Sequence, residues 1–335
     1  MTKNPIFSEI DFEKNGKQLG FLRLPHSVHH SAYGWIPIPI ASIKNGDGPT
    51  VLIMGGNHGD EYEGQILAAN LIRLLEPDML NGQVILLPMA NFPAAKAGKR
   101  TSPIDEGNLN RSFPGKPNGN PTEIIAHYIE HSLLPLCDYV IDLHSGGTSL
   151  IYNGANMLVL RPRNKQENQQ IISLLNDFGL PNAFFIDANP VTISSAARRQ
   201  GAISIVTELG GGGYVNNEIL KQAKQGILHF LYKQKVLHAK FAPESPPAKP
   251  RIMRIDSKKH YVYARHTGVF VPHFDLGCTV KTGETAGHVH FPDQPWRTPE
   301  PILFVGDGEI ICQRALAQVN PGDCVFQLGE ELNNT

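Results

Sequence analysis

Histidine and acidic residues gather in three glycine-rich stretches, and each stretch follows an apolar run. His58 and Glu61 lie in "GGNHGDEYEG" after "TVLIM", His144 lies in "DLHSGG" after "YVI", and Glu208 lies in "TELGGGG" after "ISIV". Imidazole and carboxylate groups bind zinc, and they also act as general acids and bases. The three stretches therefore suggest a metal site built from distant parts of the chain.

His58 and Glu61 are three residues apart on a turn that enters a helix, so both side chains can reach one point. With His144 they make two histidines and one glutamate, a set that holds catalytic zinc and leaves a fourth position for water. Asp142, two residues before His144, can share its face of the strand and fix its tautomer. Glu208 remains as a general base and acid. We expect one Zn²⁺ per subunit on His58, Glu61 and His144.

Two neighbouring acids, Asp60 and Glu63, compete with Glu61 as the metal ligand. A helical turn would point Asp60 away from His58. We interpret both as turn-capping, solvated acids.

A further motif, "NLNRSFPG", places Asn110 beside Arg111, and Arg100 lies upstream in "AGKRTSP". Arginine captures carboxylates through two parallel hydrogen bonds, so Asn110 and Arg111 are candidates for binding a substrate carboxylate. Arg100 is a candidate for polarising the scissile carbonyl. The alternative is that these arginines form structural salt bridges with Asp105 or Glu106.

Strand-like and helix-like stretches alternate between residues 50 and 234, which predicts an α/β fold with a doubly wound, mostly parallel sheet. The carboxyl ends of such strands form the ligand crevice, so the three stretches can meet there. Thr122 is the expected N-cap of a helix over 122–137. We expect a zinc-dependent catalytic domain over 1–242, a proline-rich linker over 243–251, and a small all-β domain over 252–332.

The balance of charged residues limits the classes of partner that we expect for this protein. The 335 residues carry 30 basic and 31 acidic side chains, a formal net charge of −1, which argues against nucleic acid or an anionic membrane as a partner. The N-terminal segment lacks an apolar signal core, and no apolar run approaches the roughly 20 residues of a membrane-spanning helix. We expect a cytoplasmic protein that forms a homodimer or another homo-oligomer.

The motifs "GGNHGDEYEG", "NLNRSFPG", "DLHSGG" and "TELGGGG", in this order, resemble the succinylglutamate desuccinylase/aspartoacylase family, which has a zinc-carboxypeptidase-like fold. "RTSPIDEGNLNRSFPG" is most similar to the branch that deacetylates N-α-acetyl-L-2,4-diaminobutyrate in ectoine degradation. The resemblance implies zinc on the three predicted ligands, Glu208 as base and acid, and Asn110 with Arg111 at the substrate carboxylate. It maps the carbonyl-polarising arginine to Arg100.

The resemblance also implies a C-terminal β-domain, and in some members this domain places a tyrosine in the substrate pocket. Tyr261 and Tyr263 are available for that position. The segment "GVFVPHFDLGCTVKTGETAGHV" resembles a biotinyl/lipoyl-like barrel. The hairpin turn "FPDQPWRTPE" lacks the lysine of a cofactor carrier, so we expect a structural or gating domain and not a carrier.

The expected function is zinc-dependent hydrolysis of the amide bond in a small N-acyl amino acid, with acetyl as the acyl group and N-α-acetyl-L-2,4-diaminobutyrate as the substrate. The alternatives within the enzyme class are desuccinylase or aspartoacylase activity and a carboxypeptidase acting on short peptides. A non-enzymatic binding module is the alternative outside it. The residues alone leave the acyl group and the amino acid open.

Overall fold

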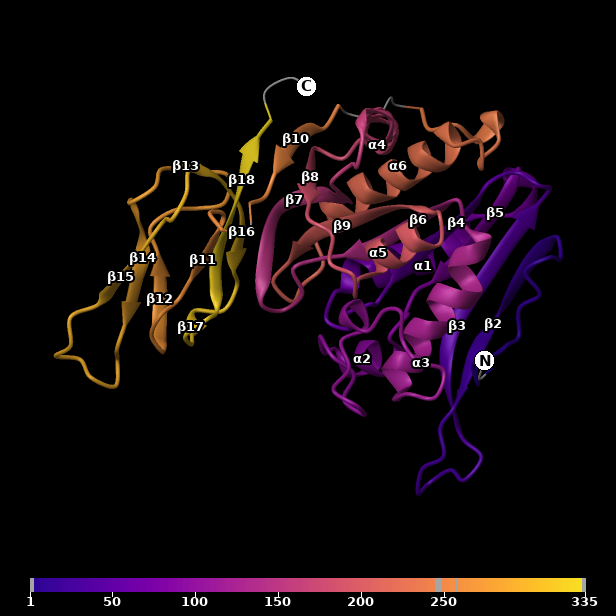
Figure 1. Cartoon of the computed structure of the whole chain (residues 1–335), viewed down its shortest axis with the longest axis horizontal. Helices are drawn as coiled ribbons and strands as arrows, with labels where there is room; N and C mark the ends of the chain where they lie inside the picture. Colours follow the sequence, from indigo (N-terminus) through magenta and orange to yellow (C-terminus); the bar gives the residue numbers. More distant parts are fainter. Residues whose placement is uncertain (1–2, 245–248, 257, 333–335) are drawn as a thin grey trace.

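A large twisted sheet runs through the whole molecule (Figure 1). The computed structural model describes residues 3–244, 249–256 and 258–332. Within these residues the sheet has 14 strands in the order β1-β2-β3-β5-β4-β6-β9-β7-β8-β10-β18-β16-β13, with β11 paired to β18. The strands are β1 (Phe7–Ser8), β2 (Gly16–Pro25), β3 (Trp35–Asn45), β4 (Thr50–Gly55), β5 (Gly82–Leu87), β6 (Tyr139–His144), β7 (Leu150–Leu160), β8 (Asn182–Ile186), β9 (Ile203–Gly211), β10 (Arg251–Arg254), β11 (Tyr261–Tyr263), β13 (Thr279–Val280), β16 (Gly308–Arg314) and β18 (Cys324–Glu331).

Helices cover both faces of the central strands, as the sequence predicts for a doubly wound sheet. Residues of β4 alternate between the faces because successive strand side chains point in opposite directions. Val51 and Ile53 belong to the core with α1, α4 and α6, whereas Leu52 and Met54 belong to the core with α3 and α5. The helices are α1 (Tyr62–Leu74), α2 (Phe92–Ala97), α3 (Pro121–Tyr128), α4 (Lys165–Phe178), α5 (Ile193–Arg199) and α6 (Asn217–Lys233).

The sheet is mixed, so the expectation of a mostly parallel sheet holds only for its central strands. Strands β5, β4, β6 and β9 run parallel, but β3 is antiparallel to β5, and β7 is antiparallel to β9. Only a few residues separate β3 from β4 and β6 from β7. A parallel return needs a crossover of a dozen or more residues, so these short connections reverse the chain direction.

The N-cap of α3 also differs from the expectation. Asn120, not Thr122, caps the helix, and its side chain accepts a hydrogen bond from the Glu123 amide in a capping box. Thr122 instead donates its amide and hydroxyl to Asp105. The α-helix ends at Tyr128 and continues as a π-helical turn over Ile129–Leu133.

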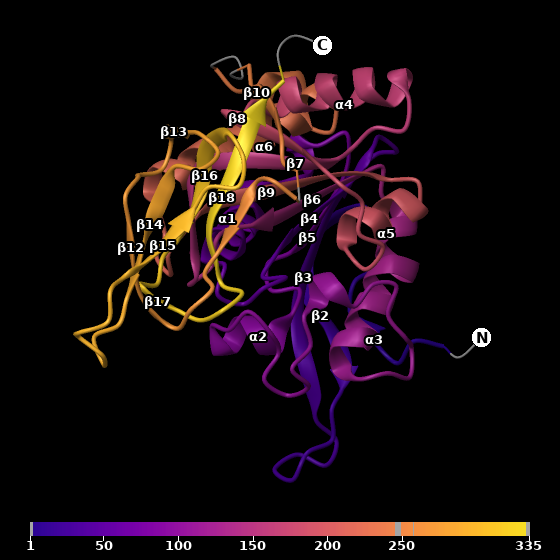
Figure 2. The same cartoon turned by 60° about the vertical axis from the view of Figure 1, so that its left-hand side comes forward.

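The C-terminal residues extend the main sheet and also form a second one. Strand β10 pairs parallel with β8, and β16 pairs antiparallel with β7. Figure 2 also shows β10 beside β8. The second sheet contains β12 (Gly268–Pro272), β14 (Thr285–His290), β15 (Glu300–Leu303) and β17 (Gln318–Val319). Past Arg251 the described residues contain strands and turns and no helix, as expected.

The division into two domains stays a prediction. The C-terminal strands have a core of their own, which includes Phe270, Phe304 and Phe326. Residues 245–248 of the expected linker lie outside the described residues, and Arg251 already begins β10.

Each helix in the described part of the chain is too short or too polar for a membrane span.

Candidate active site

The three candidate metal ligands and the candidate base lie at or just after the carboxyl ends of three adjacent parallel strands. Strand β4 pairs with β6, and β6 pairs with β9, so that His144 lies directly opposite Glu208. The turn after β4 needs glycine: Gly56 has a φ of +67°, and a Cβ on Gly59 would lie 2.0 Å from the carbonyl oxygen of Ala94. This sharp turn carries His58 and Glu61 back over the strand ends.

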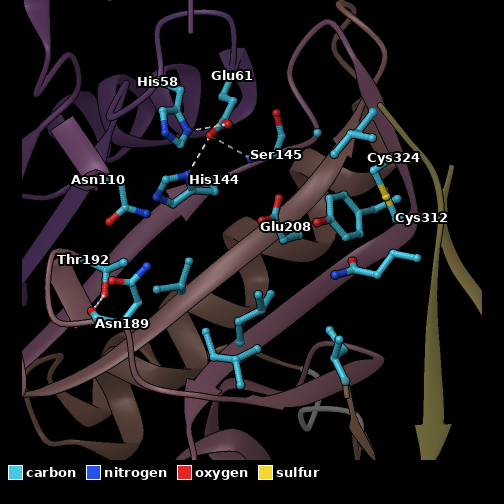
Figure 3. Close-up of a pocket in the computed structure, with 18 of the residues that line it drawn as sticks. His58, Glu61, Asn110, His144, Ser145, Asn189, Thr192, Glu208, Cys312 and Cys324 are labelled. Carbon is cyan, nitrogen blue, oxygen red and sulfur yellow. Dashed lines mark hydrogen bonds and ion pairs between the residues drawn. The ribbon is translucent and has the colours of Figure 1, made fainter. Parts of the chain in front are cut away.

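His58, Glu61 and His144 form a buried cluster (Figure 3) whose ligand atoms all lie within 4.8 Å of one another. The Nδ1 atom of His58 is 2.7 Å from one oxygen of Glu61, and the Nδ1 atom of His144 is 2.8 Å from the other. The structure thus brings together the three residues that the sequence singles out as metal ligands, in an arrangement that could hold a metal ion.

The far nitrogen of each imidazole faces an oxygen acceptor. The Nε2 atom of His58 is 3.1 Å from Asn108 Oδ1, and the Nε2 atom of His144 is 2.6 Å from Asp142 Oδ2. Asn57 donates to the same oxygen of Asp142. When both imidazoles are neutral and carry their protons on Nε2, both Nδ1 lone pairs point toward the Glu61 carboxylate. Lone pairs and a carboxylate that converge in this way fit a cation between them, and this donor set suits zinc.

The pKa shifts in the cluster indicate that the Glu61 carboxylate favours positive charge beside it. Burial opposes the charged form of Glu61, but His144 and His58 hold the pKa of that carboxyl well below its usual range. Burial also opposes the charged form of His144, yet Asp142 and Glu61 raise its pKa well above the usual value. Glu61 therefore presents an ionised carboxylate to the centre of the cluster.

Asp60 and Glu63 are buried, so the interpretation as solvated acids is wrong. One oxygen of Asp60 accepts hydrogen bonds from both the amide and the hydroxyl of Thr148, each 2.9 Å long. Burial raises the pKa of Glu63 despite a hydrogen bond from Ser145. Both acids are enclosed because the loop after β6 packs onto the turn after β4.

Glu208 lines the same pocket, and its Oε2 atom is buried and accepts no hydrogen bond from the described residues. Burial, followed by the negative charge of Glu61, raises the pKa of Glu208 to about 8. A carboxyl group without a structural partner, beside a candidate metal centre, is free to exchange a proton.

Asn110, Arg111 and Arg100 line the pocket too. Asn110 Oδ1 accepts the Ile193 amide at 3.0 Å, which leaves the Asn110 side-chain nitrogen free to donate. Arg100 Nη1 lies 3.4 Å from both Glu61 Oε1 and His58 Nδ1. Partial burial and the charge of Arg100 lower the pKa of Arg111. Two adjacent guanidinium groups make this end of the pocket attractive to an anion.

The alternative that these arginines pair with Asp105 or Glu106 is not seen. Among the ion pairs of the described residues, Arg100 pairs with Glu61, and Asp105 accepts hydrogen bonds from Thr122.

The pocket has a volume of about 470 Å³ and two walls that lie far from the motifs in sequence. One comes from the C-terminal strands and includes Tyr261, Tyr263 and Gln327, so both tyrosines considered from the sequence reach the pocket. The other is the segment 187–192 after β8, with Asn189 and Thr192 beside Asn110 in Figure 3. No motif marks that second wall, and the motif "NLNRSFPG" does not by itself indicate that its first residue, Asn108, contacts His58.

Comparisons with known proteins agree with the geometry. Residues 47–233 match the family model "Succinylglutamate desuccinylase/Aspartoacylase catalytic domain". The chain is 40% identical over 332 residues to N-alpha-acetyl-L-2,4-diaminobutyric acid deacetylase from Halomonas elongata, covering 98% of this chain and 95% of the relative.

Two solved structures are similar along nearly their whole length. A succinylglutamate desuccinylase/aspartoacylase from Rhodobacter sphaeroides has a TM-score of 0.91 at 36% identity, covering 98% of this chain and 100% of its own. The product-bound ectoine utilization protein EutE (DoeB) from Ruegeria pomeroyi has a TM-score of 0.92 at 34% identity, covering 98% and 99%.

Proposed function

Because this chain belongs to the succinylglutamate desuccinylase/aspartoacylase family of amide-hydrolysing enzymes, we propose that it is a zinc-dependent deacetylase of N-α-acetyl-L-2,4-diaminobutyrate. The observation that carries the proposal is the convergence of His58, Glu61 and His144 in one pocket with Glu208, whose Oε2 atom has no hydrogen-bond partner among the described residues. The substrate is suggested by the full-length similarity to the Halomonas elongata deacetylase.

Zinc on His58, Glu61 and His144, when bound, supplies a Lewis acid that polarises the substrate carbonyl and makes a water more acidic. Glu208 accepts the proton of the attacking water and later delivers it to the leaving amine. Arg100, next to Glu61, is placed to stabilise the negative charge that develops on the carbonyl oxygen.

Asn110 and Arg111 hold the substrate by its α-carboxylate. The Asn110 side chain is fixed by the Ile193 amide, and Arg111 Nη1 donates to the Asn110 carbonyl oxygen at 2.7 Å. These contacts orient both groups before substrate arrives, so less conformational entropy is lost on binding. A carboxylate held here fixes the position of the amide bond relative to the metal centre.

A substrate panel tests the proposal. Zinc-supplemented enzyme is offered N-α-acetyl-L-2,4-diaminobutyrate, N-acetylaspartate, N-succinylglutamate and a dipeptide, and release of the acyl group or amino acid is measured. We expect the highest kcat/KM with N-α-acetyl-L-2,4-diaminobutyrate. Cleavage of the dipeptide alone would establish a carboxypeptidase instead, and a preference for either of the other two would reassign the substrate.

Glu208→Gln tests the assignment of the base. The substitution keeps the shape of the side chain and leaves the three candidate ligands in place. We expect unchanged zinc content by elemental analysis and a kcat that falls by roughly 10²- to 10⁴-fold. A fully active variant would show that another group accepts the proton.

The cytoplasmic location and the homo-oligomeric state stay predictions.

A further inference from the structure

One carboxylate lines the pocket outside the catalytic centre. Of the acids among the lining residues, Glu61 and Glu208 belong to that centre, and the remaining one is Asp187, directly after β8. We propose that Asp187 binds the side-chain ammonium of the diamino acid and thereby selects a basic substrate. This inference rests on the proposed function, since it concerns the substrate of the same site.

Asp187 belongs to the wall next to the proposed carboxylate clamp. Its segment leads through Asn189 and Thr192 into α5, and the first amide of α5, on Ile193, donates to Asn110. Figure 3 shows Asn189, Thr192 and Asn110 together on one side of the pocket. The ammonium of 2,4-diaminobutyrate lies only two carbons from the α-carbon, about 4 Å away. A substrate held by Asn110 therefore needs its acid on a wall close to the clamp.

The Asp187 carboxylate is held in place and retains an accepting oxygen. Arg161 Nε donates to Asp187 Oδ1 at 2.6 Å, while Arg161 Nη2 donates to the carbonyl oxygen of Ile255. No hydrogen bond from the described residues goes to Asp187 Oδ2. The side chain is 66% exposed, so substrate can reach that oxygen. Arg161 itself is not among the lining residues of the pocket.

The rest of the pocket would otherwise disfavour a cation on the substrate side chain. Arg100 and Arg111 are both positive, and the neighbours of Asp187 on its wall include the apolar Ile186, Leu160 and Ile255. An ammonium placed among guanidinium and apolar groups loses water without compensation. Asp187 supplies that compensation, and it also repels the side-chain carboxylate of an acidic amino acid.

The test compares two substrates of the same carbon frame on wild type and Asp187→Asn. The substrates are N-α-acetyl-L-2,4-diaminobutyrate and N-α-acetyl-L-2-aminobutyrate, whose side chain lacks the ammonium. We expect Asp187→Asn to raise KM for the diamino substrate about tenfold with kcat nearly unchanged, because the contact is equal in ground and transition states. The kcat/KM for the neutral substrate should change less than about twofold.

Arg161→Gln is the matched control, because it removes the ion pair and keeps the carboxylate. It should retain the preference for the diamino substrate. The inference is overturned if Asp187→Asn affects both substrates equally, if it affects neither, or if Arg161→Gln loses the preference to the same extent. Wild type that is active on neutral N-acetyl amino acids but not on the diamino one overturns the proposed function and this inference together. A wild type that accepts both, with the preference unaffected by Asp187→Asn, overturns this inference alone.

Discussion

At the scale of single residues, the candidate metal centre depends on hydrogen bonds behind the ligands. His144 lies between Glu61 and Asp142, and Asn57 in turn donates to Asp142. An imidazole held in this way keeps its Nε2 proton, and its Nδ1 lone pair stays directed at the metal position. We therefore expect Asp142 to influence metal affinity without being a ligand.

Asp142→Asn should weaken zinc binding by roughly 10- to 100-fold, because the amide cannot hold the imidazole as a carboxylate does. Zinc affinity is measured by competition with a chromophoric chelator. Asp138 is an exposed acid directly before β6, and its side chain accepts the Thr50 amide. Asp138→Asn is the control and should bind zinc as wild type does. Equal affinity in the Asp142 variant and wild type would contradict the orienting role.

Glu208 makes the stability of the metal-free protein depend on pH. Burial and the charge of Glu61 raise its pKa from the ordinary 4.5 to about 8. Between these values the unfolded chain releases the proton and the folded chain keeps it, so rising pH favours unfolding. This contribution is complete below pH 4.5 and is lost as pH rises to about 8.

Relative to Glu208→Gln, the free energy of unfolding of metal-free wild type should fall with rising pH, by up to about 1.4 kcal/mol per pH unit. Urea unfolding of both proteins at a series of pH values measures the difference. Both proteins contain the same other titrating groups, so the contributions of these groups cancel in the difference between the two free energies of unfolding. A difference that stays flat over this interval would show that Glu208 titrates near its ordinary value.

At the scale of elements, strands with a glycine-rich polar end could be predicted from the sequence, and strands without one could not. The runs that end at His58, His144 and Glu208 combine an apolar core pattern with a polar terminus, so both the strands and the metal cluster follow from them. Strand β7 has no such signal: it starts with partly buried residues and lies antiparallel to β9. The wall around Asp187 is brought to the pocket by tertiary contacts, such as that between Asn110 and Ile193, which no local pattern encodes.

The cap of α3 shows a similar limit and gives a prediction at this scale. Asn120 and Thr122 are both good N-cap residue types, and the choice between them depends on Asp105, which takes the hydrogen bonds of Thr122. Asn120→Ala should lower the free energy of unfolding by about 1 kcal/mol, measured by urea denaturation. Asn118→Ala, an exposed neighbour, is the control and should be nearly neutral. An equal effect of the two substitutions would contradict the capping box.

At the scale of the whole molecule, the C-terminal strands are joined to the catalytic part through shared sheet and shared core. Strand β10 pairs with β8, and Met253 of β10 packs in a buried cluster with Phe184 and Ile311. The same region supplies Tyr261 and Gln327 to the pocket. A site that uses residues from both sides of this junction requires the two parts to keep a fixed relative position.

Met253→Ala tests how strongly the two parts are coupled. Met253 is 1% exposed, and removing its side chain should lower the free energy of unfolding by about 2–5 kcal/mol. Because the sheet is continuous, we expect one unfolding transition for the whole chain. Hydrogen exchange of peptides from β4 and β18, measured at a series of urea concentrations, monitors this transition. Val271→Ala, at an exposed position in the second sheet, should cost far less. In the contrary outcome, peptides from β18 lose protection from exchange at a lower urea concentration while peptides from β4 keep the wild-type unfolding midpoint. That result would show that residues 252–332 unfold as a separate domain. Their contribution to the pocket would then be lost before the candidate metal centre unfolds.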